Sequence, residues 1–143
     1  MYKVLLVEDN PQPSSDINKL LSEFCQVHST SSPVIAMNLA IANKYNLIMI
    51  DVNQHSGTSG ISIANSIRNL SNYNSIPIVA FVLIRLVESK EYLLSRGYTH
   101  LIPEPFNKRN FAQQIKFILS SQKINSGSFP LPMSKLISPK LVY

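Results

Sequence analysis

Short, unbroken apolar runs alternate along the chain with longer segments in which apolar residues recur every three or four positions. Two of the runs, residues 4–7 (VLLV) and 47–50 (LIMI), contain no polar position. Such runs are typical of strands covered on both faces, as in a parallel sheet flanked by helices. Residues 26–28, 76–82 and 100–102 are further strand candidates. We therefore expect five strands.

The first two helices are expected to begin at serine caps. Ser14 or Ser15 would cap a helix that runs to about residue 24. Ser32 would cap the next one, with Pro33 at the first helical position and an end near residue 43. The residues expected to face the core of this second helix are Ile35, Ala36, Leu39 and Ala40.

Three more helices are expected in the second half of the chain. One spans about residues 59–70, one ends at Gly97, and the last is capped by Asn107. The last helix would bury Phe111, Ile115, Ile118 and Leu119. The regular alternation of strand and helix predicts an α/β fold, a doubly wound five-stranded parallel sheet with flanking helices.

Composition and length fit one ordinary globular domain. The chain has 143 residues, of which 45% are hydrophobic and 15% charged. Its apolar runs are too short to span a bilayer, and it opens directly into a strand pattern with no signal-peptide zones. The single cysteine, Cys25, lies in an apolar context and is expected to be a buried, inert thiol. We therefore expect a cytoplasmic protein without a membrane partner.

The net charge is +5, but the lysines and arginines are scattered and form no dense basic run interleaved with aromatic residues. A solvated surface accounts for them better than a nucleic-acid interface, so no nucleic-acid partner is expected. We divide the chain into a domain at residues 1–122 and an extension at residues 123–143. The extension contains three prolines and no acidic residue, yet it is too apolar for a flexible linker. It either packs on its own domain or meets a partner.

Acidic residues follow both of the buried strands. Glu8 and Asp9 end the first, and Asp51 ends the run at residues 47–50. The carboxyl ends of the first and third strands of such a sheet lie side by side, so the three carboxylates should share one crevice. Carboxylates this close raise one another's pKa unless a hard cation relieves them, and Mg²⁺ prefers oxygen ligands. Alternatively, the acids only end strands at the surface.

Taken together, several motifs resemble the response-regulator receiver domains of two-component signalling, including the chemotaxis-regulator type. They are residues 4–10 (VLLVEDN), 47–51 (LIMID) and 76–80 (IPIVA), and Gly97 followed by residues 104–106 (EPF). The resemblance covers residues 2–122 and implies a flavodoxin-like signalling module, not an enzyme. It implies that Asp51 accepts a phosphoryl group from a histidine kinase or phosphotransfer protein. It also implies that Mg²⁺ is held by Glu8, Asp9, Asp51 and the backbone carbonyl of Asn53.

Three positions depart from the family pattern. Val82 stands where the family has its switch hydroxyl, Leu101 where it has the aromatic that rotates on activation, and Glu104 where it has a lysine. The usual hydroxyl-and-aromatic switch is therefore not expected to operate. A carboxylate at residue 104 would oppose a phosphoryl group that a lysine would attract.

Two cations are candidates to compensate for Glu104, namely Arg85 and Lys108. Glu104 has two further interpretations: a fourth carboxylate that tightens divalent-metal binding, or a side chain that turns to water. These alternatives stay open.

An apolar segment follows the fourth strand candidate, with a candidate docking patch at Leu83, Ile84, Leu86 and Val87. The patch would bind a downstream protein or a second copy, or else pack under the extension. The leading hypothesis is a stand-alone receiver in a phosphorelay that signals through a protein partner. The alternative is a phosphorylation-independent interaction module that keeps the fold and has lost the switch.

Overall fold

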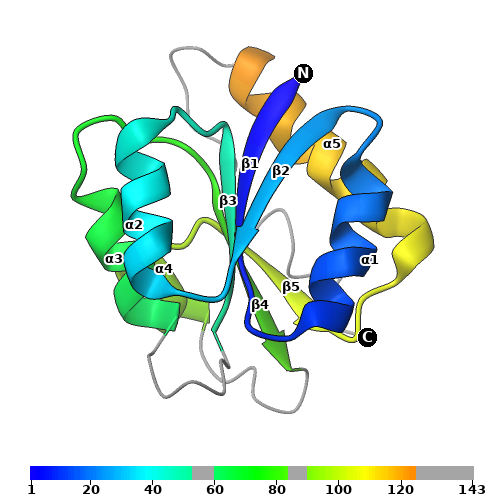
Figure 1. Ribbon diagram of the computed structural model, residues 1–143, viewed down its shortest axis with the longest axis horizontal. Helices are drawn as coiled ribbons and strands as arrows, with labels where there is room; N and C mark the ends of the chain where they lie inside the picture. Colours follow the sequence, from blue (N-terminus) through cyan, green and yellow to red (C-terminus); the bar gives the residue numbers. More distant parts are fainter. Residues whose placement is uncertain (53–59, 84–89, 125–143) are drawn as a thin grey trace.

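The computed structural model describes residues 1–52, 60–83 and 90–124, which form one five-stranded sheet between two layers of helices (Figure 1). The strands are β1 (Tyr2–Val7), β2 (Cys25–Thr30), β3 (Leu47–Asp51), β4 (Ile78–Leu83) and β5 (His100–Glu104). All neighbouring strands are parallel, in the order β2-β1-β3-β4-β5. The predicted doubly wound parallel sheet is therefore confirmed, with the strand order typical of flavodoxin-like folds.

Five helices flank the sheet within the described residues. They are α1 (Pro11–Leu21), α2 (Pro33–Ala42), α3 (Gly60–Arg68), α4 (Lys90–Ser95) and α5 (Lys108–Ile124). Helices α1 and α5 cover one face, and α2, α3 and α4 cover the other (Figure 1). None of the helices in the described part of the chain is long and apolar enough to cross a membrane.

Strand β1 shows why the apolar runs have no polar alternation. Val4 and Leu6 pack into the core cluster that includes α1 and α5, whereas Leu5 and Val7 pack into the cluster on the α2 and α3 side. All four side chains are fully buried. A strand with helices on both faces has no wet side, so every position favours an apolar residue.

Helix α1 starts earlier than the sequence suggested, and the prediction of a cap at Ser14 or Ser15 was wrong. Asn10 is the cap, and its Oδ1 accepts a hydrogen bond of 3.1 Å from the Gln12 backbone N–H. Pro11 then occupies the first turn, where its fixed φ suits a helix and its missing N–H costs nothing.

Helix α2 begins as predicted, with Ser32 Oγ accepting a hydrogen bond of 3.2 Å from the Ile35 backbone N–H. Ala36 and Ala40 are buried as expected, and Leu39 packs partly against the same core. Ile35, however, is 50% exposed, so its predicted place on the inner face was wrong. Because nearly every residue of α2 is apolar, periodicity alone could not tell the inner face from the outer one.

In the second half of the chain, the predictions for Gly97, Asn107 and the core face of the last helix are confirmed. Gly97 adopts a φ of 100° just after α4, a conformation that glycine reaches without the penalty of a side chain. Asn107 accepts a hydrogen bond of 2.9 Å from the Arg109 backbone N–H at the start of α5. The four core positions expected in that helix, Phe111, Ile115, Ile118 and Leu119, are all buried.

Cys25 is also buried, and burial raises the pKa of its thiol to about 11, as expected for an inert cysteine. Helix α5 ends at Ile124, two residues past the boundary set at residue 122, and the division into domain and extension stays a prediction. Residues 125–143 of the extension lie outside the described residues. So do five residues to which the sequence assigned a role, namely Asn53, Ile84, Arg85, Leu86 and Val87. The side chain of Leu83 is likewise not described.

Candidate functional site

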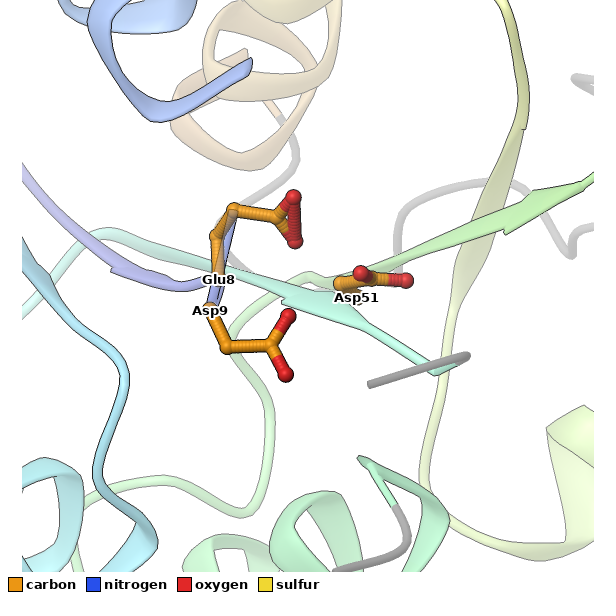
Figure 2. A group of neighbouring side chains, drawn as sticks. All are labelled: Glu8, Asp9 and Asp51. Carbon is orange, nitrogen blue, oxygen red and sulfur yellow. The ribbon is translucent and has the colours of Figure 1, made fainter. Parts of the chain in front are cut away.

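Three carboxylates meet beyond the carboxyl ends of β1 and β3. Val7 pairs with Ile50 in the parallel register, so the next residues along the two strands are Glu8 and Asp51. Glu8, Asp9 and Asp51 each offer one oxygen, and these oxygens all lie within 4.8 Å of one another. Figure 2 shows the carboxylates of Glu8 and Asp9 extending toward Asp51. The predicted convergence of these three carboxylates is therefore confirmed.

Backbone hydrogen bonds to the neighbouring strands fix this arrangement. The Glu8 N–H donates to the carbonyl of Thr30 at the end of β2, with a distance of 3.0 Å. The Val52 N–H, just after Asp51, donates to the carbonyl of Phe81 in β4, with a distance of 3.1 Å. The chain therefore leaves β1 and β3 in set directions, which holds the two acids side by side.

Burial and mutual repulsion change the protonation of this cluster. Glu8 and Asp51 are each only 6% exposed. Burial, a hydrogen bond to Asp51 and the negative charges of Asp51, Glu104 and Asp9 raise the pKa of Glu8 from 4.5 to about 9. Glu8 therefore holds a proton at neutral pH when no cation is bound.

Glu104 adds a fourth carboxyl group to the same edge of the sheet. It is the last residue of β5, where it pairs with Leu83, and it is partly buried. Burial and the charge of Asp51 raise its pKa to about 7. No cation of the described residues contributes to the pKa of either Glu8 or Glu104.

The residues of the cluster fit a divalent cation. All the ligand atoms are carboxylate oxygens, which suit Mg²⁺ and similar hard ions. The Glu8 Oε2 atom is buried and has no hydrogen-bond partner among the described residues. A cation would give this oxygen a partner, displace the Glu8 proton and reduce the repulsion.

Val82 and Leu101, which stand where the family has its switch residues, both lie in the core cluster on the α2 and α3 side. Val82 is 5% exposed and Leu101 is 1% exposed. Neither side chain carries a polar atom that could contact a phosphoryl oxygen.

Lys108, a candidate compensating cation, has another partner. Its Nζ lies 3.2 Å from Asp16 Oδ2 on α1, and its side chain is 63% exposed. Its role beside Asp51 stays a prediction. Arg85, the other candidate, and Asn53, whose carbonyl was assigned to the metal, lie outside the described residues.

The sequence reasoning missed the part that Asn10 plays at this site. Asn10 caps α1 directly after the acidic pair, so it is the only residue between Asp9 and the first helical residue, Pro11. The signal was present in the sequence, since an asparagine before a proline is a common start for a helix.

Comparisons with known proteins agree with this fold and site. A model of the family described as "response regulator receiver domain" matches residues 4–116. The chain is similar to the sensor protein GacS of Pseudomonas syringae pv. syringae, with 28% identity over 117 residues. That match covers 79% of this chain and 13% of that protein, so the chain spans only a small part of its relative.

Solved structures show the same fold. The receiver domain of sensor histidine kinase PA1611 from Pseudomonas aeruginosa PAO1, which has a magnesium ion coordinated in its active site cleft, has a TM-score of 0.73 and 24% identity. That match covers 83% of this chain and 98% of the other. The chemotaxis protein CheY4 of Vibrio cholerae has a TM-score of 0.76 and 23% identity, covering 82% and 98% of the two chains. Because the family model matches most of this chain, which also has the family's fold, the chain belongs to the response regulator receiver domains of two-component signalling.

Proposed function

We propose that this receiver domain accepts a phosphoryl group on Asp51 with the help of Mg²⁺ and passes the signal to a protein partner. The observation that carries the proposal is the grouping of Glu8, Asp9 and Asp51, whose oxygens lie within 4.8 Å of one another at the carboxyl edge of the sheet. The magnesium ion in the cleft of the similar PA1611 receiver domain supports the choice of metal. The carbonyl of Asn53 would complete the ligand set.

In this proposal the phosphoryl donor is a phosphohistidine of a histidine kinase or phosphotransfer protein. An Asp51 carboxylate oxygen attacks the phosphorus, the bond from phosphorus to the histidine nitrogen breaks, and the histidine recovers its electron pair. Glu8 and Asp9 would hold the cation, and Glu8 would give up its proton to do so. The bound cation would neutralise negative charge on the transferring group.

Glu104 and Val82 would limit how well the phosphorylated form is held. The family's lysine would attract the phosphoryl oxygens, whereas Glu104 repels them when ionised. Val82 offers no hydroxyl to them. We therefore propose that phosphorylated Asp51 is short-lived and that the signal does not use the usual hydroxyl-and-aromatic switch. With that switch absent, a downstream partner would read the charge at the site or the apolar docking patch that includes Leu83.

The test is the intact mass of the protein after incubation with Mg²⁺ and acetyl phosphate or phosphoramidate. The expected result is a gain of one phosphoryl group that Asp51→Asn abolishes. Asp16→Asn is the matched control, because Asp16 lies outside the cluster and pairs with Lys108. If the folded protein binds Mg²⁺ and shows no mass gain, the proposal fails and a phosphorylation-independent interaction module takes its place.

A further inference from the structure

Helix α2 has an apolar outer face. Among the described residues, three of the seven large apolar side chains that are exposed lie on this one helix: Val34 at 69%, Ile35 at 50% and Ile41 at 66%. Asn38 and Ala42 are the other exposed residues of the helix. These five positions form a continuous arc at 100° per residue, opposite the buried Ala36 and Ala40. We call this arc the α2 outer face.

Such a face is unusual for a helix on the surface of a domain. Asn38 is the one polar residue of α2, and the helix has no charged residue. An amphipathic surface helix normally presents polar and charged residues to water, whereas a helix that is apolar all round is normally covered on both sides. The sheet side of α2 packs on the core. The α2 outer face therefore needs a second covering element.

The chain carries a segment of matching chemistry. Residues 125–143 contain no acidic residue and no glycine after residue 127. They are rich in large apolar residues, which include Phe129, Leu131, Met133, Leu136 and Ile137. A segment with this composition gains free energy by burying its side chains.

The place where α5 ends brings this segment within reach. Lys116 of α5 lies over the ring of Phe24, whose carbonyl accepts a hydrogen bond from the Tyr2 N–H at the start of β1. At the far end of α2, Asn43 accepts a hydrogen bond of 3.0 Å from Lys3 Nζ, one residue along β1. Both helices thus end at the amino edge of the sheet, although they lie on opposite faces (Figure 1).

The length of the segment is sufficient. The 19 residues beyond Ile124 can extend over at most about 60 Å, whereas the ten residues of α2 span only about 15 Å. Crossing the amino edge of the sheet past two layers of roughly 10 Å each leaves more than enough chain to follow the helix. Covalent attachment also keeps the segment at a high effective concentration near the helix.

We propose that residues 125–143 fold back across the amino edge of the sheet and cover the outer face of α2. Val34 and Ile41 are the main contacts on the helix. This inference does not depend on phosphorylation of Asp51.

A nitroxide spin label on the full chain tests the proposal. The label is attached at Ser134→Cys, because the native Cys25 is buried and its thiol is inert. In an amide NMR spectrum, the label should selectively reduce the signals of α2 compared with the reduced, diamagnetic sample. Ile41→Lys should restore those signals, and Val34→Lys should do the same. Both side chains are largely exposed, so neither change should unfold the domain.

The control variant is Phe117→Lys, which places a charge on an exposed aromatic residue of α5 and should leave the effect on α2 intact. The proposal is overturned if α2 signals are unaffected, or if Phe117→Lys and not Ile41→Lys removes the effect. It is also overturned if the signal loss occurs in a mixture of isotope-labelled protein without nitroxide and nitroxide-labelled protein without isotope. That last result would mean that a second copy covers the face.

Discussion

The carboxyl groups of Glu8 and Asp51 share a hydrogen bond across the ends of two neighbouring parallel strands. The bond needs a proton, and the raised pKa of Glu8, about 9, keeps that proton in place at neutral pH. The site is therefore neutralised in part by a proton until a cation takes over. Protonation of Glu8 and binding of a divalent cation therefore exclude each other. Cation binding should release the Glu8 proton, and its affinity should depend on pH.

The first prediction is that Mg²⁺ binding at pH 7–8 releases about one proton, and that affinity rises up to roughly tenfold per pH unit until pH nears 9. Titration calorimetry in buffers of different ionisation enthalpy measures the protons released. Glu8→Gln should weaken binding and abolish the release, whereas Glu23→Gln, at an exposed position, should change neither. Binding without proton release in the unmodified protein would contradict the assignment of the proton to Glu8.

The same pKa sets the stability of the cation-free protein. The folded state retains the Glu8 proton up to about pH 9, whereas the unfolded chain loses it near pH 4.5. This contribution is present below pH 4.5 and is lost as the pH rises toward 9. Asp51→Asn removes both the repulsion and its effect on Glu8, so it should stabilise the cation-free protein by about 0.5–2 kcal/mol at pH 8. Urea unfolding at pH 5 and pH 8 measures this; an equal or lower stability of the variant at pH 8 would contradict it.

The third prediction concerns Glu104 and the phosphorylated form. Two unit charges about 4 Å apart interact by roughly 4 kcal/mol at an effective dielectric constant of 20, and partial exposure reduces this. Replacing repulsion by attraction in Glu104→Lys should raise the half-life or steady-state level of phosphorylated Asp51 by roughly 10- to 100-fold. Intact mass over time measures the level. Glu104→Gln removes the charge without adding one, so its level of phosphorylated Asp51 should lie between those of the unmodified protein and Glu104→Lys. A level in Glu104→Lys no higher than in the unmodified protein would refute the role of Glu104.

The sequence was sufficient to predict the fold and the acidic cluster because both depend on local patterns. The run at residues 47–50 has no polar position, and Asp51 follows it directly, so the strand and its terminal carboxylate could both be recognised. The neighbourhood of Glu8 and Asp51 then follows from the strand order of a doubly wound sheet.

Other features depend on contacts between distant parts of the chain, which the pattern does not contain. Ile35 was placed on the inner face of α2 because the helix is apolar on both sides. Arg68 looks like an ordinary surface residue in the sequence, yet its guanidinium binds carbonyls up to 29 residues away. The ion pair between Lys108 and Asp16 of α1 could not be predicted from the sequence either.

His100 gives a prediction for acid conditions. Its side chain is fully buried in β5, its Nδ1 lies 2.7 Å from Thr99 Oγ1, and burial lowers its pKa from 6.5 to about 4. The unfolded chain therefore takes up a proton below pH 6.5 that the folded state does not, and stability is lost as the pH falls from 6.5 toward 4. The loss attributable to His100 should reach roughly 3 kcal/mol near pH 4.

Comparison with His100→Leu isolates this effect, because the carboxylates contribute equally to both proteins. The difference in unfolding free energy between the two should change by that amount between pH 7 and pH 4, as measured by urea unfolding at several pH values. A difference that stays constant over this range would show that the histidine does not titrate differently in the folded state.

The last prediction concerns Arg68, which holds three backbone segments together. Its Nη1 donates hydrogen bonds of 2.7 Å to the carbonyls of both Tyr73 and Ile76, and its Nε and Nη2 donate to the carbonyl of Gly97. The fork of the guanidinium reaches all three carbonyls at once, which the single ammonium of a lysine cannot do. Arg68→Lys should therefore lower the unfolding free energy by about 2–4 kcal/mol, because carbonyls away from water lose their partners.

Arg96→Lys is the matched control for this change. Arg96 is exposed and lies over the ring of Tyr92 at 5.5 Å, so the same substitution there should cost less than about 1 kcal/mol. Urea unfolding of both variants at one pH gives the comparison. Equal costs at the two positions would mean that Arg68 contributes charge alone, and that the turn after α3 and the turn before β5 are held in place by other contacts.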